Sequence, residues 1–190
     1  MVNDSAPAEA LLIVDAQNAF MAGADAVPEH DVLVPALGDL LRRARAAHAL
    51  VVHLQNDGPP GEVDEPHRHG WELFYGVEAS DHEFVIRKSQ DDGFDGTELQ
   101  GLLTHRGVRR LAIGGVMSEM CVGATARGAM ARGFEVVIPH DGHATYNISA
   151  APGSSAEVPA AMVSRVAEWS LGDEVDVVAR TIDVSFVRVG

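Results

Sequence analysis

The sequence predicts a three-layer α/β/α fold, in which helices cover both faces of a mostly parallel sheet. Short runs that are apolar at every position indicate strands buried on both faces, as in parallel sheets. These runs alternate along the chain with segments of helical spacing, which is the order expected of a parallel α/β protein. The length of 190 residues suits one domain, residues 1–190, with a sizeable core.

The first half of the chain supplies three expected strands and one long helix. The strands are the apolar runs 11–14, 50–54 and 84–86. A helix that begins near Asp31 lies between the first two, with apolar residues at three-and-four spacing. The irregular segment 55–80 follows the carboxyl end of the second strand, so we expect it to lie over a ligand crevice.

The middle of the chain predicts a short helix and then a strand, helix, strand unit. Thr97 suits the N-cap of the short helix. The unit that follows spans residues 108–139, with Ser118 as the expected N-cap of its helix and Gly133 as the C-cap.

The last third of the chain predicts a helix, a strand and an alternating tail. The helix carries apolar residues at Val158, Ala161, Met162, Val166 and Trp169. Residues 175–178 indicate a strand. The tail 181–189 alternates well enough to predict one more edge strand, which could pair across an oligomer.

The charge of the chain excludes polyanionic partners. The formal net charge is −14 at pH 7. The one basic cluster, Arg42, Arg43 and Arg45, lies near the end of the first long helix, where positive charge stabilises the negative end of the helix dipole. We therefore expect no nucleic acid and no membrane as partners.

Other sequence features bear on location and cofactors. Residues 1–9 carry no positively charged n-region, and no apolar run approaches the roughly 20 residues that span a bilayer. The single cysteine excludes an internal disulfide, and a free thiol suits a reducing compartment, so we expect a soluble cytoplasmic protein. Neither a G-x-G-x-x-G after the first strand nor a Walker pattern is present, so no nucleotide cofactor is expected.

That single cysteine, Cys121, is a candidate nucleophile. If Ser118 is the N-cap, Cys121 lies in the first helical turn, where free backbone N–H groups and the helix dipole favour a thiolate. The alternative is a small buried hydrophobe, the common state of a lone intracellular cysteine.

Two further residues are expected beside Cys121. Asp15 follows the first apolar run directly, and Lys88 ends the third. Lys88 is also the only lysine among fourteen basic residues, which suggests that this position needs a compact ammonium group. Because the carboxyl ends of parallel strands meet at one edge of a sheet, the acid, the lysine and the cysteine should converge there.

Three segments together resemble the isochorismatase-like cysteine hydrolases. They are VDAQNAF (14–20), FVIRKSQDDGFDGTEL (84–99) and GVMSEMCVGATARGAMARGF (115–134). The resemblance runs from about residue 11 to about residue 145, most of the chain. It implies a Rossmann-like fold and a catalytic triad of Asp15, Lys88 and Cys121.

The resemblance also implies details of the site. A cis peptide bond is expected between Val116 and Met117. The backbone N–H groups of Met117 and Cys121 are expected to form an oxyanion hole.

The activity implied is hydrolysis of an amide, lactam or ureido carbon–nitrogen bond in a small molecule, through a thioester and without a cofactor. A homo-oligomer is also implied. Two alternatives stay open. Some relatives cleave the vinyl ether of isochorismate but lack the cysteine, and a catalytically idle relative could serve as a binding or oligomer scaffold.

Six further residues are candidates for contacting substrate. Trp71 could stack on substrate, or equally pack under a lid or across a dimer. Phe94 could form a wall of the pocket or anchor its loop to the core. The expected set is Gln17, Phe20, Gln55, Trp71, Phe94 and Glu119.

A metal is not expected near this site. The nicotinamidase branch of the family binds a metal through an Asp-x-His pattern and a later histidine, whereas this chain has Asn56, Asp57 and Gly58. His53, His67 and His69 are therefore expected to face solvent or the pocket.

Three residues after the fifth expected strand are assigned no catalytic role. Asp141 lies where the family keeps an acid that ties a loop to backbone donors. His140 and His143 are not expected to be catalytic, because the triad already contains a proton carrier.

Overall fold

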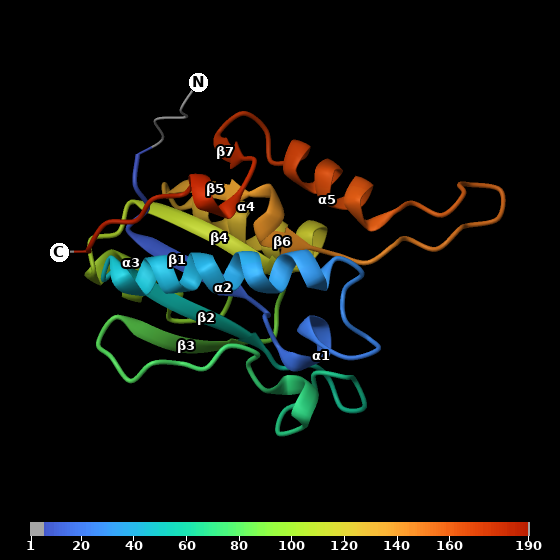
Figure 1. Cartoon of the computed structure of the whole chain (residues 1–190), viewed down its shortest axis with the longest axis horizontal. Helices are drawn as coiled ribbons and strands as arrows, with labels where there is room; N and C mark the ends of the chain where they lie inside the picture. The colour runs from blue at the N-terminus through green and yellow to red at the C-terminus, as the bar shows by residue number, and fades with distance from the viewer. Residues whose placement is uncertain (1–5, 190) are drawn as a thin grey trace.

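The computed structural model describes residues 6–189, which form one parallel sheet between two layers of helices (Figure 1). The strand order is β3–β2–β1–β4–β5–β7, and the short β6 pairs with β4. Within the described residues, every pairing between these strands is parallel. The strands are β1 (Ala10–Val14), β2 (Leu50–Asn56), β3 (Glu83–Lys88), β4 (Arg110–Val116), β5 (Glu135–Pro139), β6 (His143–Ala144) and β7 (Val175–Val178). The predicted α/β/α fold is confirmed.

Successive residues of the central strands pack on opposite faces of the sheet. In β1, Leu11 and Ile13 pack in the cluster that contains helix α2, whereas Leu12 and Val14 pack with α3 and α4. Both clusters are fully buried, which explains why these strands are apolar at every position. The main helices are α1 (Asn18–Met21), α2 (His30–Ala46), α3 (Leu99–His105), α4 (Gly123–Ala131) and α5 (Ala160–Trp169).

The strand order reverses between β1 and β4. Val14 lies in register with Gly115, so the two strands end side by side. After β1 the chain continues to the face of the sheet covered by α2, and after β4 it continues to the opposite face, covered by α4. Such a switch point opens a crevice outside the carboxyl ends of the strands. Gly115 has a φ of 132°, and a Cβ there would lie 2.0 Å from the carbonyl oxygen of Val14. Only glycine allows this approach.

The C-terminal tail is not the predicted edge strand. Residues Thr181–Asp183 form a short helical turn, and Phe186 makes a single parallel bridge to Ala8. Arg43 of α2 donates to the carbonyls of Thr181 and Val184, and these two hydrogen bonds stabilise the turn in the tail. The arginines near the end of α2 are therefore structural, as expected.

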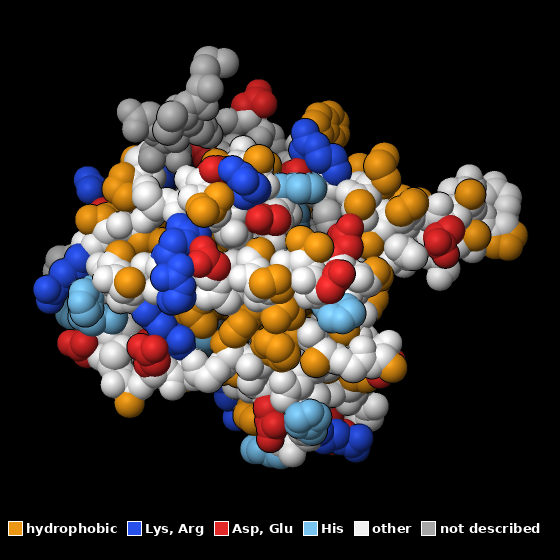
Figure 2. Space-filling view, in the orientation of Figure 1, with side chains coloured by type: hydrophobic (Ala, Val, Ile, Leu, Met, Phe, Trp, Pro, Cys, Tyr) orange, Lys and Arg blue, Asp and Glu red, His pale blue; other side chains and the backbone are white. Residues whose placement is uncertain are grey.

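The last helix also differs from the sequence prediction. Val158 lies before α5 and pairs with Ile148. The apolar stripe of Met162, Val166 and Trp169 is exposed, and hydrophobic side chains are visible on the surface over α5 (Figure 2). The helix packs against the rest of the protein through its other face. An exposed apolar stripe would suit a contact between subunits, but the homo-oligomer stays a prediction.

Among the described residues, none of the helices combines the length and apolar character needed to cross a membrane. The single domain over residues 1–190 stays a prediction, because residues 1–5 and 190 lie outside the described part.

Replacing Gly115 with alanine should destabilise the protein by at least about 2 kcal/mol, since the position combines a positive φ with backbone contact. Urea denaturation followed by circular dichroism measures the change. Gly101→Ala is the matched control: this glycine lies inside α3 with open space around it, so alanine should stabilise by about 0.5–1 kcal/mol. A Gly115→Ala protein as stable as the parent would contradict the role assigned to the β1–β4 contact.

Candidate active site

Lys88 lies at the centre of the residues that the strand ends bring together. Its Nζ is 2.9 Å from Asp15 Oδ2 and 3.3 Å from Cys121 Sγ. The ammonium also donates to the carbonyl of Gln90 at 3.1 Å and lies 3.4 Å from Asn56 Oδ1. Because Lys88 is buried, its charge needs these partners, and a compact ammonium can reach all of them from one point.

Asp15 is held in place by its backbone. Its φ is 50°, in the left-handed region that few residues other than glycine adopt, and its N–H donates to the carbonyl of Leu54 at 2.9 Å. One carboxylate oxygen, Oδ2, pairs with Lys88. The other, Oδ1, is buried and accepts no hydrogen bond that meets geometric criteria from the described residues. Asp15 therefore keeps one oxygen available for a proton.

Cys121 lies in a π-helical turn, Ser118–Val122, which we call the π turn. Its defining bonds run from Val122 N to Met117 O, 3.2 Å, and from Gly123 N to Ser118 O. Single π turns of this kind recur at functional sites. Cys121 is only 6% exposed, so the residue is almost completely buried. The peptide bond between Val116 and Met117, just before the turn, is cis, where the resemblance placed it.

The prediction that Ser118 is the N-cap of the helix is wrong. The N-cap position belongs to Met117, and the Ser118 hydroxyl instead contacts His143 Nδ1 at 2.8 Å and Ser164 Oγ at 3.0 Å. Burial raises the pKa of the Cys121 thiol well above its usual value, and the Asp15 carboxylate raises it further, while Lys88 lowers it. Burial and Asp15 therefore favour the thiol form of Cys121, and Lys88 favours the thiolate.

The two charged neighbours of Cys121 influence each other's pKa. Burial raises the pKa of Asp15 above its usual value, although Lys88 and the thiol oppose that rise. Burial opposes the charge on Lys88, yet Asp15 and Cys121 raise the pKa of Lys88 above its ordinary value. The Lys88 ammonium is therefore favoured by its two partners.

The sequence matches the Isochorismatase domain family over residues 9–167. The chain belongs to the isochorismatase family. It is 60% identical over 180 residues to a streptothricin hydrolase of Streptomyces noursei, covering 95% of this chain and 71% of that protein. A second streptothricin hydrolase of that organism is 59% identical over 179 residues, or 94% of this chain and 65% of that protein, just under two thirds of its length. The fold matches the crystal structure of an isochorismatase from Pseudomonas putida KT2440 with a TM-score of 0.84 at 27% identity, over 95% of this chain and 94% of that one.

These matches make the protein an enzyme, a cysteine hydrolase of the amidohydrolase type within the isochorismatase family. The individual roles of its site residues remain proposals.

The segment after β2 lies against the loop after β1, at the edge of the sheet where Asp15, Lys88 and Cys121 converge. Gln17 donates from its amide nitrogen to the carbonyls of Asn56, at 3.0 Å, and Trp71, at 2.9 Å. Its amide oxygen accepts from Asn56 N at 2.9 Å, and Gln55 also donates to the Trp71 carbonyl. Both glutamine side chains hold the backbone around the site. Direct contact of either with substrate stays a prediction.

The other candidate substrate residues are distributed differently. Phe20 packs with α2, and Phe94 packs with Phe134 and under the guanidinium of Arg132. For Phe94, the interpretation as a core anchor is thus the one that the contacts support. Trp71 donates from its indole nitrogen to Asp57, and Glu119 is exposed in the π turn. Their contact with substrate also stays a prediction.

Two residues near the triad escaped the sequence analysis. Asp91 Oδ1 lies 3.7 Å from Cys121 Sγ, and Asn56 contacts Lys88. Two sequence features could have indicated them. Asp91 begins an acidic pair three residues after Lys88, and Asn56 lies at the end of the second expected strand. A hollow of about 370 Å³ lies beside this site, lined by Asp57, Arg87, Lys88, Ser89, Gln90, Asp95, Gly96 and Thr97.

The residues here do not fit the metal site of the nicotinamidase branch. Asp57 is paired with Arg87 at 2.7 Å, and Asn56 donates to Asp64 at 2.7 Å. His67 and His69 are exposed, as expected. His53 is not: it is buried and bonded to Glu83 at 2.7 Å, so the expectation that it faces solvent or the pocket is wrong.

Replacing the two charged partners should move the thiol pKa in opposite directions. Asp15→Asn removes the charge that raises it, so the pKa should fall, whereas Lys88→Met removes the stabilising cation and should raise it. The pH dependence of iodoacetamide alkylation, read by mass spectrometry, measures both shifts. An unchanged pKa in both variants would show that burial alone raises the pKa of Cys121, and would contradict the roles assigned to the two charges.

Proposed function

We propose that this protein hydrolyses an amide-type carbon–nitrogen bond, lactam or open chain, in a streptothricin-like small molecule, through a thioester on Cys121. The single observation that carries the proposal is the buried contact of Lys88 with both Asp15 and Cys121. The 60% identity to a streptothricin hydrolase supports the choice of substrate class.

The first step of the proposed mechanism moves the thiol proton. Asp15 Oδ1 has no hydrogen bond from the rest of the described chain, so it can take this proton as general base. Proton transfer neutralises Asp15 and creates a thiolate beside the Lys88 ammonium, so the net charge of the buried site does not change. The raised pKa of Asp15 suits this role, because it brings the base closer to the thiol in proton affinity.

The next steps form and break the thioester. The thiolate attacks the carbonyl carbon, and the oxyanion is stabilised by the backbone N–H groups of Met117 and Cys121; one such donor contributes about 3 kcal/mol. Asp15 returns its proton to the leaving nitrogen as the carbon–nitrogen bond breaks. Water, deprotonated by Asp15, then cleaves the thioester, and the proton returns to the Cys121 thiolate.

The acidic side chains beside Cys121 and the adjoining hollow favour a cationic substrate. Asp91 lies 3.7 Å from Cys121 Sγ, and Asp95 lines the hollow beside Lys88; both are exposed, and we call them the acidic rim. Asp91 is close enough to Sγ to repel both the thiolate and the oxyanion, and a positive group on the substrate would neutralise that repulsion. The same rim disfavours isochorismate, a dicarboxylate, and Cys121 would have no role in vinyl ether cleavage.

The test of this function is incubation of the purified protein with streptothricin, followed by mass spectrometry. A lactam gives one product heavier by one water, whereas an open-chain amide gives two fragments. Cys121→Ala should lower kcat by at least about a thousandfold without unfolding the protein. Absence of turnover by the parent, or full activity of Cys121→Ala, would refute the proposal.

Asp91→Asn should lower kcat/KM for a cationic amide by about tenfold, as expected from loss of one charge-assisted contact. For a neutral amide of similar size, kcat/KM should stay the same or rise, because the repulsion of the thiolate is removed. Glu98→Gln, an exposed acid further along the same loop, is the matched control for net charge. Equal losses on both substrates would argue against recognition of a cation.

A further inference from the structure

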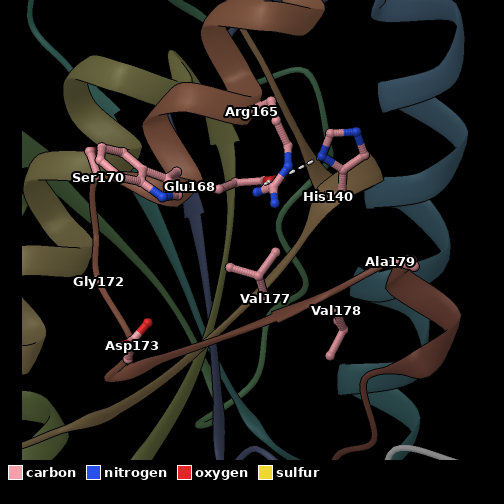
Figure 3. Close-up of a pocket in the computed structure, with 10 residues that line it drawn as sticks. His140, Arg165, Glu168, Ser170, Gly172, Asp173, Val177, Val178 and Ala179 are labelled. Atoms are coloured by element: carbon pink, nitrogen blue, oxygen red, sulfur yellow. Dashed lines mark hydrogen bonds and ion pairs between the residues drawn. The ribbon is translucent and has the colours of Figure 1, made fainter. Parts of the chain in front are cut away.

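A second cluster of reactive side chains lies away from the triad, where helix α5 lies against β6. His140 comes from the turn that follows β5, His143 is the first residue of β6, and Glu168 comes from α5. The three donor atoms lie within 4.8 Å of one another. Figure 3 shows His140, Glu168 and Arg165 pointing toward a common point beside a surface hollow.

The carboxylate of Glu168 is the meeting point of the cluster. Its Oε1 lies 3.1 Å from His143 Nε2 and is also bonded to His140 Nδ1. Its other oxygen, Oε2, accepts from Arg165 at 2.8 Å. Glu168 and His143 are buried, whereas the His140 side chain is 48% exposed. Two imidazole nitrogens therefore converge on one buried, negatively charged oxygen.

The spacing suits a divalent transition metal. Bonds of about 2.0–2.1 Å to nitrogen and oxygen place neighbouring ligands of a tetrahedral site roughly 3.3 Å apart. The distance from His143 to Glu168 already matches, and the half-exposed His140 can rotate outward to open the third position. Two histidines and one glutamate form a donor set that zinc uses when it keeps an open coordination position.

The surroundings provide the outer contacts that such a site needs. His143 Nδ1 lies 2.8 Å from Ser118 Oγ, which in turn contacts Ser164 Oγ at 3.0 Å. If the hydroxyl of Ser118 accepts from Nδ1, the lone pair of Nε2 faces the cluster, as ligation requires. Arg165 holds the second oxygen of Glu168, which favours a carboxylate bound through one oxygen.

The hollow beside the cluster leaves room for the remaining ligands. Its volume is about 810 Å³, and it is lined by His140, Arg165, Glu168 and Trp169 among others, with none of the triad residues. Water or a small anion could therefore complete the coordination from the open side.

We propose that His140, His143 and Glu168 form a zinc-binding site, separate from the triad and adjoining the hollow under α5. The competing interpretation is a closed hydrogen-bond cluster, in which both imidazoles donate N–H groups to Glu168 and no ion binds. The two interpretations differ in one measurable property, which is the affinity for Zn²⁺.

Zinc at this site would connect to the nucleophile. Ser118 opens the π turn that carries Cys121, and His143 is its direct partner. Bound zinc would fix the His143 ring and, through it, the first residue of the π turn.

The experiment is equilibrium dialysis of Zn²⁺ against the Cys121→Ser protein, which removes the thiol as a competing ligand. We expect about one zinc ion per chain with micromolar affinity. His140→Ala and Glu168→Gln should each weaken binding at least tenfold. His69→Ala is the matched control, since it removes an exposed histidine that is 3.1 Å from Glu72 in a similar pair outside the cluster.

A thermal readout on the parent enzyme separates a specific site from loose surface binding. Zinc should raise Tm for the parent and for His69→Ala, but not for His140→Ala. Absence of zinc binding at concentrations up to about 100 μM, or unchanged affinity in both cluster variants, would overturn the proposal and leave the hydrogen-bond cluster as the correct interpretation. Because no readout depends on amide turnover, its failure is distinguishable from failure of the proposed function.

Discussion

The arrangement of the active site depends on one buried ammonium group. Lys88 contacts both the carboxylate of Asp15 and the thiol of Cys121, and its ammonium group is shielded from water. A buried cation is costly unless anionic or polar partners surround it. The strand ends, the loop carbonyl of Gln90 and the side chain of Asn56 all supply such partners. In the mechanism that we propose, the proton moves between sulfur and carboxylate because this cation compensates either position of the negative charge.

The fold and the convergence of the triad could be predicted from the sequence for a simple reason. Strands buried on both faces leave an unmistakable pattern, and parallel strands must end at one edge. Asp15, Lys88 and Cys121 each sit within a few residues of such an end, so local sequence was enough to bring them together. The resemblance to the isochorismatase-like hydrolases added what periodicity cannot give, the Rossmann-like arrangement and the cis bond between Val116 and Met117.

The features that sequence reasoning missed depend on contacts between distant segments. Ser118 looked like a helix cap because its neighbours favour one, but its hydroxyl is engaged by His143 and Ser164, residues far along the chain. Burial and the Asp15 carboxylate both raise the pKa of the thiol, and neither effect can be derived from the residues next to Cys121 in the sequence. Gln17 is a comparable case. Its amide nitrogen donates to the carbonyls of Asn56 and Trp71, which are too far along the chain for a local sequence pattern to indicate the contact. The tail bends because Arg43 reaches it from α2.

The bridge between Ala8 and Phe186 has a practical consequence for handling the enzyme. Ala8 accepts from Val187 N and donates to the carbonyl of Ser185, so the N-terminal and C-terminal segments meet beside the start of β1. The triad lies beyond the opposite end of that five-residue strand, about 17 Å away. A tag, carrier domain or surface anchor fused near either terminus would therefore be attached at the amino end of β1. Cys121 lies beyond the carboxyl end of that strand, so such a fusion should not obstruct the candidate active site.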